Sequence, residues 1–166
     1  MVNVSALPAQ KRMAHSSMSK ANFILSKIAE YVLLMFIGGF VYTIFEMVYR
    51  TYSHWSMFIV GGLCLIIVGL LNEGILPSKW GLVPQCLVGA VAITIVEFLT
   101  GLIVNVWLGL NVWDYSDLPF NVMGQICLPF TLIWVALALI AILVDDQVRY
   151  RIFGEPKPKY VFWTQK

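Results

Sequence analysis

Four long apolar runs dominate the sequence and leave few folds open to it. They cover about residues 28–49, 56–72, 82–107 and 122–145. A helix needs roughly 20 apolar residues to cross a bilayer, and a spanning segment must satisfy its backbone hydrogen bonds internally. Charged residues make up only 12% of the chain, against about a quarter in soluble domains. The sequence therefore predicts an all-α integral membrane protein, a four-transmembrane-helix bundle with the lipid bilayer as its main partner.

The second run is the shortest of the four. On its own it covers about residues 57–71, and it reaches both membrane interfaces only when Trp55, Ser56 and Asn72 are included. Its length leaves a re-entrant helix open as an alternative to a full span. Glycines in the first and second runs, at Gly38, Gly39, Gly61 and Gly62, would let helices approach closely.

The basic residues predict how the chain crosses the membrane. If both termini are cytoplasmic, ten of the eleven Lys and Arg residues lie inside and only Arg50 lies outside, as the positive-inside rule requires. We therefore expect a cytoplasmic N-terminal arm at residues 1–26 with little order before about Lys20, a membrane domain at 27–146 and a cytoplasmic tail at 147–166. The bacterial cytoplasmic membrane is the expected location. The ten inside residues are Lys11, Arg12, Lys20, Lys27, Lys79, Arg149, Arg151, Lys157, Lys159 and Lys166.

Polar residues gather in the outer halves of the predicted helices. A carboxylate at membrane depth costs a few kcal/mol or more unless it is paired or solvated, so Glu46 and Glu97 need partners there. Arg50 follows Glu46 by one helical turn, and its guanidinium could bridge both carboxylates, or one of them and Asp114. We expect Arg50 to be the partner of Glu97. The sequence thus predicts an outward-facing polar pocket lined by Glu46, Arg50, Glu97 and Asp114. The full set of candidate ligand- or ion-binding residues is Glu46, Arg50, Glu97, Asn105, Asp114, Tyr115, Asn121 and Gln125.

A purely structural interpretation of the same residues stays open. The charged set could be a buried ion-pair network that only locks the helices together. The segment 113–121 could likewise be a turn held by the Asp114 side chain, with Asn121 as the N-cap of the fourth helix. On either interpretation, Asn121 and Gln125 are expected on one face of the fourth helix.

Several kinds of chemistry lack their sequence signals. No spacing of His, Cys and carboxylates resembles a zinc site, no P-loop is present, and no Ser–His–Asp trio is suggested. We therefore expect no metal, no cofactor, no catalytic residue and no nucleic-acid partner. The cysteines Cys64, Cys86 and Cys127 all lie in apolar runs and are expected to be small buried hydrophobes.

The order of the polar motifs resembles a known family. Glu97–Gly101, then Trp113-Asp-Tyr-Ser116, then Pro119-Phe-Asn121, with Gly124–Leu128 and Trp134, are similar to the bacterial ABC-transporter type IV membrane proteins, also called CmpB-like. Glu46 and Arg50 fit the same pattern. Members of that family often have Arg where this chain has Gln125, and a Pro-x-Tyr-Gly segment before the third helix where this chain has residues 76–85. The resemblance implies a transport role, and the missing Arg makes the pocket more acidic.

Three functions follow from these features. The first is a permease-like transport subunit that uses the polar pocket and works as a homo-oligomer or with a partner transport subunit. The alternative is a non-catalytic structural, regulatory or holin-like oligomer, in which small residues form the assembly surface. A membrane enzyme with these carboxylates as acid and base would lack a positioned His, Cys or metal.

Overall fold

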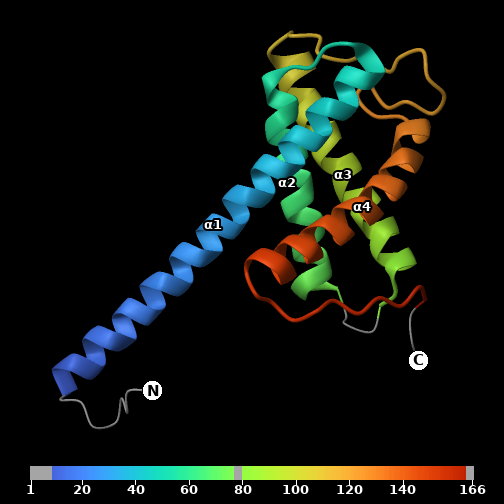
Figure 1. Ribbon diagram of the computed structural model, residues 1–166. Coiled ribbons are helices and arrows are strands. Elements are labelled where there is room, and N and C mark those ends of the chain that lie inside the picture. Colours follow the sequence, from blue (N-terminus) through green and yellow to red (C-terminus); the bar gives the residue numbers. More distant parts are fainter. Residues whose placement is uncertain (1–8, 77–79, 164–166) are drawn as a thin grey trace.

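The computed structural model describes residues 9–76 and 80–163, with side chains from residue 20 onward, and these residues are mainly helical (Figure 1). One isolated pair of bridging residues, Val122 and Ile126, lies in a loop. Two α-helices continue directly into short π-helices. The elements in order are α1 (Ala9–Arg50), α2 (Trp55–Leu70), η2 (Leu71–Ile75), α3 (Leu82–Gly101), η3 (Leu102–Trp107) and α4 (Leu128–Ile152).

Four helical segments are long and apolar enough to cross a membrane, which confirms the predicted fold class of an integral membrane protein. They are Lys20–Arg50, Trp55–Ile75, Leu82–Trp107 and Leu128–Ile152. Because η2 extends α2, the second segment reaches 21 residues, enough for a span. The predicted alternative of a re-entrant helix loses its main support.

The helices leave two ends with different connections (Figure 1). The end of the bundle formed by the end of α1, the start of α2, η3 and residues 108–127 is called the loop end. The opposite end, formed by η2, the start of α3, the end of α4 and residues 153–163, is called the tail end. The C-terminal half of α1 packs along α2, while its N-terminal half extends away from the other helices.

The helix α1 begins at Ala9, ahead of the first apolar run, and the expectation of little order before about Lys20 stays a prediction. Residues 9–20 contain Ala, Gln, Lys, Arg and Met and have no Pro or Gly. These are good helix formers, and nothing in the sequence stops the helix from continuing ahead of the apolar run. The polar composition of this arm distinguishes it from the apolar span, but its helix propensity is no lower, so one helix contains both.

The helix α4 begins at Leu128 rather than at residue 122, which corrects a prediction. Phe120, Met123 and Gly124 have φ of 53°, 54° and 68°, values that a right-handed helix cannot contain. Cys127, and not Asn121, is the N-cap residue, and a proline lies in the first turn, where its missing N–H is not needed. Asn121 and Gln125 therefore lie in the loop before α4.

Glycines set the contact between α1 and α2. A Cβ added at Gly38 would lie 2.6 Å from the Gly61 carbonyl oxygen and 2.7 Å from Leu65 Cβ. A Cβ at Gly61 would lie 2.7 Å from the Gly38 oxygen. The two backbones approach closely only because neither position carries a side chain. The expectation of close packing at these glycines is confirmed, and it is fulfilled within one chain.

Gly38→Ala is therefore expected to destabilise the protein by about 1–3 kcal/mol, the usual cost of overpacking a filled contact. This loss should outweigh the gain of up to about 1 kcal/mol that alanine brings to a helix interior. Thermal unfolding in detergent, followed by circular dichroism, measures the change. Gly74→Ala is the control, since a Cβ there meets no heavy atom within 4 Å. A Gly38→Ala protein as stable as this control would contradict the prediction.

Candidate functional site

Glu46 and Arg50 form an ion pair one turn apart at the loop end of α1, as their spacing predicted. Arg50 Nη2 donates to Glu46 Oε1, and Arg50 Nη1 donates to the Val112 carbonyl oxygen at 2.6 Å. Ser53 Oγ donates to the other Glu46 oxygen at 2.6 Å. Glu46 is buried, and these contacts satisfy both of its oxygens within its own helix and the following turn.

Glu97 is also buried, but its partners are neutral. Trp134 Nε1 donates to Glu97 Oε2 at 2.8 Å, and the Tyr115 hydroxyl donates to Oε1 at 3.1 Å. The prediction that Arg50 is the partner of Glu97 is wrong. The Arg50 guanidinium is instead occupied by Glu46 and by a backbone carbonyl.

Tyr115 connects the loop to the membrane helices. Its ring stacks on Phe130 of α4 with 4.6 Å between the centroids, and its backbone N–H donates to the Gly124 oxygen at 2.8 Å. Burial, and then the neighbouring Glu97 carboxylate, raise the pKa of the Tyr115 hydroxyl well above its usual value. Tyr115 therefore stays protonated at neutral pH and remains a donor to Glu97.

Asn105 and Gln125 come together although they lie in different elements. Asn105 Nδ2 donates to Gln125 Oε1 at 2.8 Å, and the Val112 N–H donates to Asn105 Oδ1 at 2.7 Å. Both side chains are buried. A Cβ at Gly101 would lie 2.9 Å from Gln125 Cβ, so this glycine lets Gln125 reach the helix. The amide pair fixes the loop to η3 without a charge.

Asp114 is exposed and Asn121 is half-buried in the loop before α4. Asp114 Oδ1 accepts hydrogen bonds from Ser116 Oγ at 2.5 Å and from the Ser116 N–H at 2.9 Å, and these bonds lower the pKa of the Asp114 carboxyl. Asn121 Nδ2 donates to the Leu118 oxygen at 2.9 Å. Among the described residues, none of these hydrogen bonds joins Asp114 or Asn121 to Glu46, Arg50 or Glu97. The structure brings the candidate residues into the same end of the bundle, but in separate groups.

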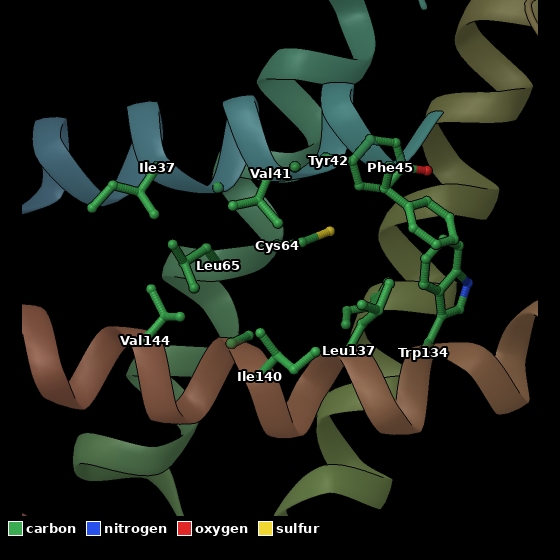
Figure 2. A pocket seen from close by; sticks show the side chains of 14 residues that line it. Ile37, Val41, Tyr42, Phe45, Cys64, Leu65, Trp134, Leu137, Ile140 and Val144 are labelled. Carbon is green, nitrogen blue, oxygen red and sulfur yellow. The ribbon is translucent and has the colours of Figure 1, made fainter. Parts of the chain in front are cut away.

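A cavity of about 130 Å³ lies between α1 and α4, with α2 behind it (Figure 2). Its walls are almost entirely apolar, and Tyr42, Phe45 and Trp134 close one end. The rings of Tyr42 and Trp134 stack with 6.0 Å between centroids. Trp134 thus contacts the cavity with its ring while its N–H holds Glu97. The polar residues predicted to line a pocket are absent from the lining of this cavity.

A second buried charged cluster, at the tail end, was missed from the sequence. Arg149 donates through Nη1 to Glu30 Oε1 and through Nε to Asp145 Oδ2, the latter at 2.7 Å. Lys27 Nζ donates to Glu30 at 2.8 Å and to Glu155 at 2.6 Å. Two signals were available: Glu30 interrupts the first apolar run, and Asp145 and Arg149 are one turn apart.

The three cysteines are buried and free, as expected for small apolar side chains.

No solved structure matches the chain. Residues 31–164 match the family described as "Putative ABC-transporter type IV". The matched range begins within α1 and includes every later helix. The resemblance drawn from the order of the polar motifs is thereby confirmed, and the chain belongs to this family of ABC-transporter-related membrane proteins.

Proposed function

We propose that the chain is a permease-like membrane subunit of a transporter, and that its ligand is an amphipathic cation. The observation that carries this proposal is the position of Glu97. Its buried carboxylate is held by Trp134, directly behind the aromatic end of the cavity between α1 and α4.

The chemistry of the cavity favours such a ligand. Its apolar walls suit the apolar part of a ligand, and the faces of aromatic rings such as Tyr42, Phe45 and Trp134 attract cations. Glu97 adds a carboxylate whose hydrogen-bond partners carry no positive charge. Arg50, the basic residue at the loop end, is paired with Glu46. The local charge therefore favours a cation over a neutral molecule or an anion.

In this proposal the other candidate residues have supporting roles. The tail end faces the cytoplasm of a bacterial cell and the loop end faces outward, in accordance with the distribution of Lys and Arg. The Glu46–Arg50 pair closes the outer end of the path. Asn105 of η3 and the loop residues Asp114, Tyr115, Asn121 and Gln125 frame that end. Because the sequence contains no P-loop, ATP hydrolysis would come from a partner subunit.

Binding of tetraphenylphosphonium to the purified protein in detergent, measured by calorimetry, tests the proposal. We expect saturable binding, and no binding of tetraphenylborate, an anion of similar shape. Ala141→Phe should abolish binding, because Ala141 lines the cavity. Ala136→Phe, an exposed position on the same helix, is the matched control and should bind normally. Equal binding of both ions, or normal binding by Ala141→Phe, would refute the proposal.

The holin-like alternative draws less support from the geometry. This alternative needs small residues at the surface between subunits, but Gly38 and Gly61 pack against each other in the contact between α1 and α2 of one chain. Ala138 packs against Gly89 of α3 in the same way. Native mass spectrometry of the detergent-solubilised chain would reveal a defined oligomer if this alternative were correct.

A further inference from the structure

We propose that the tail end binds a calcium ion between Glu73, Asp145 and Asp146. Glu73 is carried by η2 and the two aspartates by α4, so the site joins two elements that are distant in the sequence. One carboxylate oxygen of each residue lies within 4.8 Å of the others. Calcium binds oxygen ligands at about 2.3–2.6 Å, so a single ion fits among oxygens with this separation.

An unpartnered buried oxygen points to a ligand here. Asp145 is fully buried, at 0% exposure. Its Oδ2 accepts from Arg149 Nε at 2.7 Å, whereas Oδ1 has no hydrogen-bond partner among the described residues. Gly69 of α2 packs against this carboxylate, since a Cβ there would lie 2.5 Å from Asp145 Cγ. A buried carboxylate oxygen without a partner is costly, and a bound cation removes that cost.

The charges around the site are unbalanced in the same direction. Among the described residues, the cluster has five carboxylates and two basic groups, and the bases are already engaged in ion pairs. This leaves a formal surplus of three negative charges, which a divalent ion reduces to one. The carboxylates are Glu30, Glu73, Asp145, Asp146 and Glu155, and the basic residues are Lys27 and Arg149.

The donor set decides the class of metal. All three residues offer oxygen, the ligand of hard cations such as calcium and magnesium, and none offers the sulfur or imidazole that zinc prefers. Asn72 Nδ2 donates to Asp146 Oδ1 at 2.7 Å, which orients that carboxylate. Glu73 is exposed while the aspartates are buried, so an ion can enter from the solvent at the tail end and keep water ligands there.

Calcium titration of the full chain, after treatment with a chelator, tests the site. We expect saturable binding by calorimetry and a higher unfolding temperature with calcium, because a ligand that binds only the folded state stabilises it. Glu73→Gln should weaken binding at least tenfold. This variant should fold, because Glu73 is exposed. Asp117→Asn, an exposed carboxylate at the loop end, is the control and should bind calcium normally.

Two results would overturn the proposal: no calcium binding by the parent protein, or unchanged calcium affinity in Glu73→Gln. Asp146→Asn gives a second check, since it keeps the size of the side chain and removes one ligand charge. Tetraphenylphosphonium binding should be the same in Glu73→Gln and in the parent protein. The calcium site and the proposed transport cavity can therefore fail independently.

Discussion

Replacement of Arg149 by methionine is expected to lower the free energy of unfolding by about 3–5 kcal/mol, the usual cost of removing one partner from a buried ion pair. Arg149 is 3% exposed, and it binds the buried carboxylates of Glu30 and Asp145. Methionine fills much of the same space, but it leaves Asp145 without its cation and Glu30 with Lys27 alone. Thermal unfolding in detergent, followed by circular dichroism, should record a large fall in the midpoint.

Two further variants separate the ion pair from the mere loss of a long side chain. Arg151→Met removes an exposed arginine of the same helix that donates to Gln147 at 2.9 Å, and it should change stability little. A triple variant that adds Glu30→Gln and Asp145→Asn to Arg149→Met removes the buried charges together. It should recover much of the lost stability. If Arg149→Met is as stable as Arg151→Met, the tail-end pair contributes little to the fold.

The parts of the structure that depend on local spacing could be predicted from the sequence. Apolar runs of membrane length gave the four spanning segments, and the one-turn spacing of Glu46 and Arg50 gave their ion pair. The start of α4 could not be predicted in this way. Phe120 and Met123 adopt positive φ, which the sequence signals only when glycine or asparagine occupies such a position.

Contacts between distant elements were the other limit. Glu97 accepts from Trp134, 37 residues away, and Arg149 donates to Glu30, 119 residues away. No periodicity relates such pairs, so the choice of partner depends on how the helices cross. The sequence predicted Arg50 as the partner of Glu97, because an opposite charge stabilises a carboxylate at membrane depth. In the structure the Glu97 carboxylate instead accepts hydrogen bonds from the indole of Trp134 and the phenol of Tyr115.

Glu97→Gln is expected to keep the fold and to weaken tetraphenylphosphonium binding at least tenfold. The glutamine oxygen can accept from Trp134 Nε1, and its amide can donate to the Tyr115 oxygen, because a hydroxyl both donates and accepts. Both hydrogen bonds of Glu97 therefore have a neutral replacement, and the unfolding midpoint should change little. Calorimetric titration of the purified variant measures the loss of affinity.

Glu97→Leu distinguishes the electrostatic role of Glu97 from a structural one. Leucine accepts no hydrogen bond, so the Trp134 N–H, which is buried with its side chain 2% exposed, loses its partner at a cost of about 1–3 kcal/mol. If Glu97 only locks α3 to α4, the leucine variant is unstable while Glu97→Gln binds the cation as the parent protein does. If the carboxylate selects the ligand by its charge, Glu97→Gln loses binding at unchanged stability. The pair of variants thus assigns the buried carboxylate either to the fold or to the ligand.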